Sequence, residues 1–309
     1  MSNFSNILLL GGNGFVGKNF NHLNNKYNVT SPSSKELDLK VYKNVYAYIN
    51  KMNPDLVINL AGTVGGILAN KSDNYRFLDN NIQINQNLIR GLVENKVTNF
   101  LNVSSSCIYP KNMSKALKEE MILSGYLEET NEGYALAKIA SLKSCNYISS
   151  KYGYNYKTII PCNLFGPFDN FNEDSSHMIP GVISRMFKAK TNNIKKLKIW
   201  GDGSVRREFM YIKDFVSFLF FSIENFEKIP LTLNVGLGYD YTIKDYYDLI
   251  ADSMNTSFNY VNDESKPIGM KRKLVDISKL KSLGWYPSYN IETGIKETIN
   301  YYESRFAKI

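Results

Sequence analysis

The sequence has 309 residues, 43% of them hydrophobic, so the chain can bury a large core and form one or two domains. Its formal net charge of +8 comes mostly from scattered lysines, densest over 188–198, and this spread favours an anionic small ligand over nucleic acid. No apolar run is long enough to span a bilayer, and the first residues lead into a predicted strand rather than a signal peptide, so no membrane partner is expected.

Cysteine and histidine are too few for a disulfide framework or a metal centre. The chain has three cysteines, Cys107, Cys145 and Cys162, and only two histidines, none of them at the spacing of metal ligands. We therefore expect no bound metal and a reducing, cytoplasmic compartment. No internal repeat or low-complexity linker divides the chain.

The N-terminal segment predicts a dinucleotide site. An apolar run over 6–10 ends in Gly11, Gly12, Gly14 and Gly17, and a helical pattern follows through Leu23. A strand, a glycine loop and a helix in this order let backbone N–H groups approach a pyrophosphate at the helix N-terminus. The spacing Gly-x-x-Gly-x-x-Gly is a variant of the better-known Gly-x-Gly-x-x-Gly.

Further strands and helices alternate at the spacing of βαβ units. The predicted strands are 56–62, 100–103 and 158–161, and the predicted helices are 41–52, 80–95 and the segment that carries Tyr134 and Lys138. This alternation predicts an α/β fold, a Rossmann-type doubly wound parallel sheet whose ligand lies at the carboxyl ends of the strands. A smaller C-terminal α/β domain is expected to bind the substrate.

The predicted domains interleave along the chain. The dinucleotide-binding domain is expected to cover 1–163 and about 207–233, and the substrate-binding domain about 164–206 and 234–309.

Ser105, Tyr134 and Lys138 predict hydride chemistry at a C–O centre. Tyr134 and Lys138 are four residues apart and share a helix face, so the ammonium can lie near the phenol and favour the phenolate. Ser105 follows the strand 100–103, and its hydroxyl can hold a carbonyl against that phenol. A Tyr-x-x-x-Lys pair is weak support alone in a chain with 22 Tyr, but the dinucleotide fold around it strengthens the prediction.

Taken together and in order, the motifs resemble those of the extended short-chain dehydrogenase/reductases, and within them the GDP-L-fucose synthase branch. The blocks that carry the resemblance are 64–70, 105–111, 130–140, 163–167, 176–180, 200–203 and 207–209. The resemblance implies an NADPH-dependent C4 reductase of a GDP-linked 4-keto sugar, with epimerisation at C3 and C5. It also implies a homodimer formed by the helices near 80–95 and 134–150.

The resemblance assigns roles to the catalytic candidates. Ser105, Tyr134 and Lys138 match the reductase triad, and Cys107 and His177 match the acid/base pair for epimerisation. The chemistry agrees, because a C4 ketone acidifies the C–H bonds at C3 and C5, and a thiol and an imidazole both exchange protons near neutral pH.

The resemblance further implies two binding sets. The cofactor set is Gly11, Gly12, Asn13, Gly14, Phe15, Val16, Gly17, Ser33, Ser34, Lys35, Asp38, Leu39, Leu60, Ala61, Gly62, Val103, Ser104, Tyr134, Lys138, Pro161, Asn163, Leu164 and His177. The substrate set is Ser105, Ser106, Cys107, Asn163, Arg185, Trp200, Arg207 and Lys273. Ser33, Ser34 and Lys35 can hold a 2′-phosphate and no carboxylate occupies 31–35, so NADP(H) is expected ahead of NAD(H).

Two departures from the branch concern the substrate. Ile268 stands after Pro267, where the branch usually has Asp, and Cys162 replaces a more usual Thr. A reduction-only C4 reductase of a GDP-4-keto-heptose, with a separate epimerase, therefore stays open.

Other functions of the fold also stay open. They are an NDP-sugar 4-epimerase, a 4,6-dehydratase, for which Ser105, Ser106 and Cys107 offer no carboxylate, and a non-catalytic dinucleotide-binding scaffold.

Overall fold

The computed structural model describes residues 4–113, 115–173, 175–266 and 269–306. Its centre is one six-stranded sheet in the order β10-β5-β4-β3-β1-β2, with every neighbouring pair parallel. The strands are β1 (Ile7–Leu10), β2 (Val29–Thr30), β3 (Leu56–Asn59), β4 (Asn99–Val103), β5 (Asn155–Pro161) and β10 (Thr232–Val235). Successive strands run outward from β1 in both directions, so the predicted doubly wound sheet is confirmed.

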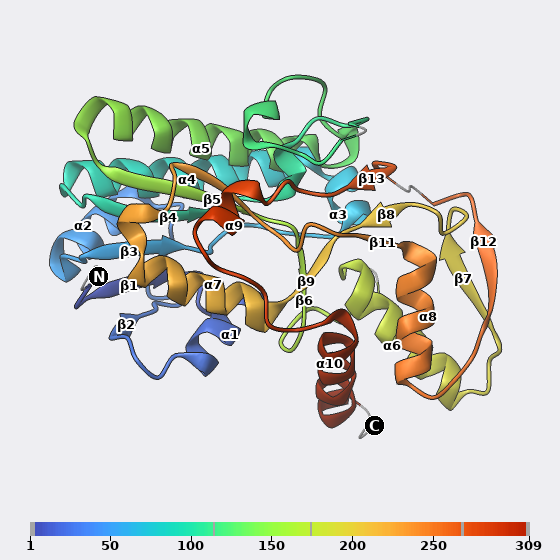
Figure 1. The fold of residues 1–309 in the computed structure, drawn as a ribbon. Helices are drawn as coiled ribbons and strands as arrows, with labels where there is room; N and C mark the ends of the chain where they lie inside the picture. Colours follow the sequence, from blue (N-terminus) through green and yellow to red (C-terminus); the bar gives the residue numbers. More distant parts are fainter. Residues whose placement is uncertain (1–3, 114, 174, 267–268, 307–309) are drawn as a thin grey trace.

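Helices cover both faces of this sheet (Figure 1). One face carries α1 (Phe15–Leu23) and α7 (Ile212–Glu224), which pack against each other. The other carries α4 (Asn74–Glu94) and α5 (Glu132–Tyr152), with α2 (Tyr42–Met52) packed against α4. Because both faces are covered, the central strands are buried runs such as Ile7–Leu10, with no polar alternation.

The remaining elements form a smaller part beside the carboxyl ends of the strands (Figure 1). Three small sheets pair β6 with β9, β7 with β12, and the central strand β8 with both β11 and β13. These strands are β6 (Asn163–Phe165), β7 (Lys196–Trp200), β8 (Arg206–Arg207), β9 (Phe209–Tyr211), β11 (Tyr241–Thr242), β12 (Asn259–Asp263) and β13 (Arg272–Lys273). The helices here are α6 (Met178–Thr191), α8 (Ile243–Ser253) and α10 (Ile291–Phe306), whereas the short α9 (Ser278–Ser282) packs against β10 at the edge of the six-stranded sheet.

Short elements complete the described chain. They are α3 (Ile67–Ser72), η1 (Ser106–Ile108), η2 (Glu119–Met121), η3 (Glu129–Asn131) and η4 (Phe226–Lys228). The predicted strands and helices of the first 161 residues all form, and the helix predicted from residue 80 begins earlier, at Asn74. The domain boundary predicted at 233 falls inside β10. Within the described residues, none of the helices combines the length and apolar character needed to cross a bilayer.

Candidate active site

The glycine loop brings the backbone of three segments into close approach. Gly11 has a φ of +83°, and a Cβ built on it would lie 2.7 Å from the backbone between Leu60 and Ala61. A Cβ on Gly17 would lie 2.4 Å from the carbonyl oxygen of Gly11. No side chain caps α1 at Gly14, so the first N–H groups of the helix are left for a ligand or solvent. These features fit the pyrophosphate of a dinucleotide.

The three reductase candidates come from neighbouring elements. Ser105 lies two residues after the strand β4, at the start of η1, and its hydroxyl accepts a hydrogen bond from the Cys107 N–H at 3.3 Å. Tyr134 and Lys138 lie one turn apart on α5, and Nζ of Lys138 lies 5.8 Å from the Tyr134 ring centroid. The same Nζ donates to the carbonyl of Val103 at 3.0 Å. The structure therefore brings the predicted triad together.

Burial governs the titration of this pair. Burial lowers the pKa of Lys138 to about 8. Burial also raises the pKa of Tyr134, the charge of Cys107 raises it further, and a hydrogen bond with Ser105 opposes both. The expectation that Lys138 lowers the pKa of Tyr134 is therefore not met, because both groups are taken out of water and burial dominates the shift of each.

Cys107 lies beside a cation from the far end of the chain. Nζ of Lys273, on β13, contacts the Cys107 sulfur at 3.4 Å. Burial opposes ionisation of the thiol, but the charge of Lys273, hydrogen bonds with Ser105 and Lys273, and the charge of His177 together lower the Cys107 pKa. Burial instead raises the pKa of Cys145 to about 12 and that of Cys162 well above its usual range. Cys107 is thus the thiol suited to proton transfer.

His177 precedes α6, and its Nδ1 lies 3.8 Å from Oδ1 of Asp169. Burial lowers the pKa of His177 and the charge of Lys273 does the same, but the nearby carboxylate of Asp169, with the charge of Cys107, outweighs them and raises it. The thiol and the imidazole are therefore shifted in opposite senses, one toward the thiolate and the other toward the imidazolium. This pairing suits removal of a proton at one group and its return from another.

These groups line one cavity of about 590 Å³, a volume suited to a small-molecule ligand. It runs from the glycine loop to β13. The predicted residues on its wall are Gly11, Asn13, Gly14, Phe15, Val16, Gly17, Leu60, Ala61, Gly62, Val103, Ser104, Ser105, Cys107, Tyr134, Lys138, Pro161, Asn163, Leu164, His177, Arg207 and Lys273.

The other predicted residues lie off this wall. They are Gly12, Ser33, Ser34, Lys35, Asp38, Leu39, Ser106, Arg185 and Trp200. The Ser33 N–H and hydroxyl both donate to Glu36 at 2.8 Å, so a carboxylate just beyond the predicted stretch already holds this serine. Arg185 donates to the Tyr247 hydroxyl at 2.7 Å, and Trp200 lies on β7 with Nζ of Lys266 5.9 Å from its ring centroid.

A three-stranded sheet presents Arg207 and Lys273 to the cavity. These two residues are partners in the register of β8 and β13, as are their neighbours Arg206 and Arg272. Burial lowers the pKa of Arg207 to about 10, against the charges of Cys107 and Glu128.

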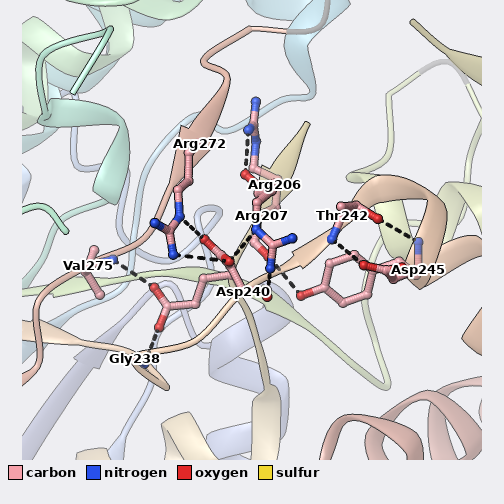
Figure 2. Close-up of polar contacts among 10 residues, drawn as sticks. Arg206, Arg207, Gly238, Asp240, Thr242, Asp245, Arg272 and Val275 are labelled. Carbon is pink, nitrogen blue, oxygen red and sulfur yellow. Dashed lines mark hydrogen bonds and ion pairs between the residues drawn. The ribbon is translucent and has the colours of Figure 1, made fainter. Parts of the chain in front are cut away.

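Two buried carboxylates hold this sheet together. Asp240 accepts from Nε of Arg206 at 2.7 Å and from Nε of Arg272 at 2.6 Å (Figure 2). Glu208, on the same layer, accepts from the N–H groups of Gly238 at 2.8 Å and Val275 at 3.0 Å. Burial raises the pKa of Glu208 to about 7, and hydrogen bonds from the N–H groups of Val275, Gly238 and Leu237 oppose this.

Sequence reasoning missed several residues on the cavity wall. They include Asn70, Glu128, Asn131, Asp169 and Met270. Asn70 lies inside the block 64–70 that carried the resemblance, and this block was the available signal. The position of Ile268, which raised the heptose alternative, lies outside the described residues. Within those residues, no group of three or more His, Cys, Asp or Glu side chains is arranged to hold a metal ion.

Comparisons with known proteins agree with this geometry. The NAD dependent epimerase/dehydratase family matches residues 7–236. The chain is 47% identical to a GDP-L-colitose synthase of Yersinia pseudotuberculosis over 96% of this chain and 97% of that one. It is 42% identical to a GDP-L-fucose synthase of Azorhizobium caulinodans over 96% of each.

A solved structure shares the same fold. A GDP-mannoheptose C4 reductase from Campylobacter jejuni with NADP bound superposes with a TM-score of 0.84, at 27% identity over 98% of this chain and 99% of that one. The family match covers well over half of the chain, and both curated relatives exceed 40% identity. The chain therefore belongs to the NAD dependent epimerase/dehydratase family.

Proposed function

We propose that this protein is an NADPH-dependent C4 reductase of a GDP-linked 4-keto-6-deoxyhexose that also epimerises the sugar, as a GDP-L-fucose synthase does. One observation carries this proposal: Ser105, Tyr134 and Lys138 share a single cavity with a thiol and an imidazole whose pKa values are shifted in opposite senses. A reductase alone needs only the first three groups. The additional acid/base pair suits proton exchange next to a ketone.

The similar proteins favour some candidate sugar substrates over others. The two curated relatives are named for GDP-L-colitose and GDP-L-fucose, and both are much more similar to this chain than the heptose reductase is. These relatives favour a 6-deoxyhexose over the heptose alternative. L-Colitose lacks the C3 hydroxyl of L-fucose, so a colitose-type substrate needs inversion only at C5. The higher identity to the colitose synthase makes this 3-deoxy substrate the second candidate.

The cofactor is NADP(H), which supplies the hydride that reduces C4. Gly11, Gly14 and Gly17 leave room for its pyrophosphate beside the uncapped start of α1. Ser104 supports the fit, because its buried hydroxyl faces no hydrogen-bond partner among the described residues and lies on the cavity wall.

The protein's own groups divide the chemistry. Ser105 and Tyr134 hold the C4 oxygen, and Tyr134 gives it a proton as reduction proceeds. Lys138 keeps the Tyr134 proton available through its nearby charge. Cys107 takes the proton from carbon, aided by the ammonium of Lys273, and His177 returns a proton from the opposite face. The guanidinium of Arg207 is suited to the diphosphate.

Assembly and compartment form part of the same proposal. We assign the nucleotide to the part of the chain around the six-stranded sheet and the sugar to the smaller part, with boundaries near 163 and 207 and just after β10. We assign the protein to the reducing cytoplasm, since Cys107 acts as a free thiol and Cys145 and Cys162 are also unpaired.

The proposed dimer forms through α4 and α5. Leu136 and Tyr147 lie three turns apart on one exposed stripe of α5, and Tyr75 and Ile82 lie two turns apart on one stripe of α4. Exposed apolar stripes on adjacent long helices suit a symmetric helix-on-helix interface.

The test is a substrate screen in deuterated water. Purified protein receives NADPH or NADH with GDP-4-keto-6-deoxymannose, its 3-deoxy counterpart or a GDP-4-keto-heptose, and cofactor absorbance and product mass are followed. We expect rapid oxidation of NADPH with a 6-deoxyhexose and deuterium at C5, with further deuterium at C3 when the C3 hydroxyl is present. If NADPH is oxidised only with the GDP-4-keto-heptose, and the product contains no deuterium, the reduction-only alternative is supported. No NADPH oxidation with any of the three would refute the proposal.

A further inference from the structure

The turn between β6 and α6 contains a strained residue. Phe168 has a φ of +66°, in the left-handed region that an aromatic residue rarely adopts. Such a conformation is unfavourable and persists only where the surroundings enforce it. Here the Phe168 ring packs 5.1 Å from the Tyr301 ring and 5.9 Å from the His22 ring, and the Asn19 side chain donates to the Pro167 carbonyl at 2.7 Å.

This turn carries Asp169 into the cavity wall. The Asp169 side chain is only 3% exposed, and its Oδ1 accepts from the Asn170 N–H at 2.7 Å. Its Oδ2 is enclosed and meets no hydrogen-bond partner within the part of the chain that the structure describes. A buried carboxylate with an unsatisfied oxygen is unfavourable unless a cation is close. The cation available is His177, whose Nδ1 lies 3.8 Å from Oδ1.

The charged groups around His177 come from three elements. Asp169 from the turn and Cys107 from η1 favour its protonated form, while Lys273 from β13 opposes it. Because Nδ1 faces Asp169, the opposite nitrogen of the ring, Nε2, is left for the sugar.

We propose that Asp169 is a positioning residue that fixes the ring of His177 through Nδ1 and holds it as a cation, so that Nε2 donates a proton to the sugar carbon. This inference rests on the proposed function. In the step, the Cys107 thiolate takes the proton of the C–H bond and becomes a thiol, and the electron pair moves into the C4 carbonyl as an enolate. His177 then gives its Nε2 proton to the opposite face of the carbon and becomes neutral. One proton leaves carbon and one returns, so no further reactant is needed.

The direct test uses the scarcity of histidine, since His22 and His177 are the only two in the chain. Protein labelled with ¹³C at histidine Cε1 is titrated by NMR, and His177→Gln assigns the two signals. We expect Asp169→Asn to lower the pKa of His177. Asp169→Glu, which keeps the charge, should retain more of the raised pKa. An unchanged titration of His177 in Asp169→Asn would overturn the proposal, whatever the substrate proves to be.

A kinetic test separates positioning from general damage. We expect Asp169→Asn to slow deuterium uptake at C5 about tenfold more than it slows reduction of a pre-epimerised ketone. The alkaline limb of the uptake profile should move to lower pH, and adding Asp169→Asn to His177→Gln should cause little further loss. Equal loss of both reactions would overturn the proposal. Failure of the wild-type protein to oxidise NADPH would refute the proposed function but leave the NMR result decisive for Asp169.

Discussion

The buried charge of Lys138 lowers the free energy of unfolding. Its amine is buried and bonded to the carbonyl of Val103, and burial lowers its pKa from 10.5 to about 8. Because the folded-state pKa lies below the unfolded one, the unfolded chain binds the proton more tightly. The cost is therefore fully present below pH 8 and fades as the pH rises toward 10.5, and the shift corresponds to roughly 3 kcal/mol.

Lys138→Met should separate stability from activity. We expect the variant to unfold at a higher temperature than the wild type below pH 8, with a gap that narrows between pH 8 and 10.5. Its reduction rate should fall by about 100-fold or more, because the proton on Tyr134 loses its charged neighbour. Thermal unfolding across this pH range and NADPH oxidation measure the two effects. Lys151→Met, an exposed position on the same helix, is the control; a variant less stable than the wild type at pH 7 would contradict this account.

At the residue scale, the sequence predicted identities better than contacts. Cys107, His177 and Lys273 were all named, but the contact between the Lys273 ammonium and the Cys107 sulfur joins residues 166 positions apart. No local pattern encodes such a contact. Asp169 was missed for the same reason. Its place beside His177 depends on the turn at Phe168, which packs against the rings of His22 on α1 and Tyr301 on α10. The Ser33–Glu36 pair, by contrast, is local and could have been recognised.

At the element scale, Asp240 ties together two strands that reach the cavity. Its carboxylate side chain is 2% exposed and joins Arg206 on β8 to Arg272 on β13 (Figure 2). The next residue of each strand, Arg207 or Lys273, lies on the cavity wall. Charge-assisted hydrogen bonds of this kind fix both distance and orientation.

Asp240→Asn should loosen substrate binding more than cofactor binding. We expect the free energy of unfolding to fall by about 1–3 kcal/mol, because the half-exposed guanidiniums lose a buried anion but remain partly hydrated. The KM for the GDP-sugar should rise by about tenfold, with little change in the Kd of NADPH at the distant glycine loop. Denaturant unfolding, kinetics and cofactor fluorescence measure these effects. Asp248→Asn, which removes an exposed pair with Lys244, is the control, and an equal effect from it would argue against a special role for Asp240.

The same scale shows why the fold was predictable. The strands β1 and β3 are buried and are almost entirely apolar, and β4 and β5 contain shorter apolar stretches at 100–101 and 159–160. The helices α1, α2 and α4 carry the periodicity of one apolar face. The two-residue strands β8, β11 and β13 have no such signal, because their pairing depends on Asp240 and on segments brought together by the fold. The smaller part therefore could not be drawn from sequence patterns alone.

At the scale of the whole molecule, the proposed dimer is open to a direct measurement. Leu136→Asp combined with Tyr147→Asp places charge on an α5 stripe whose Tyr147 is 69% exposed in the single chain. We expect the wild type to sediment as a dimer and the double variant as a monomer, because buried charge at a symmetric interface is repeated in both copies. Analytical ultracentrifugation measures the mass of each protein in solution. Tyr286→Asp, at an exposed tyrosine away from α4 and α5, should leave the mass unchanged; a monomeric wild type would end the proposal.

The contact between Lys273 and Cys107 also has a consequence for the reactivity of the three cysteines toward electrophiles. An electrophile reacts with a thiolate rather than a thiol, and of the three cysteines only Cys107 has its pKa lowered and is partly accessible. Cys145 and Cys162 are buried with raised pKa values and will react slowly in the folded protein. We therefore expect a single covalent probe to attach at the proposed proton-transfer group itself, so that alkylating agents inactivate the enzyme and a bound GDP-sugar slows the inactivation.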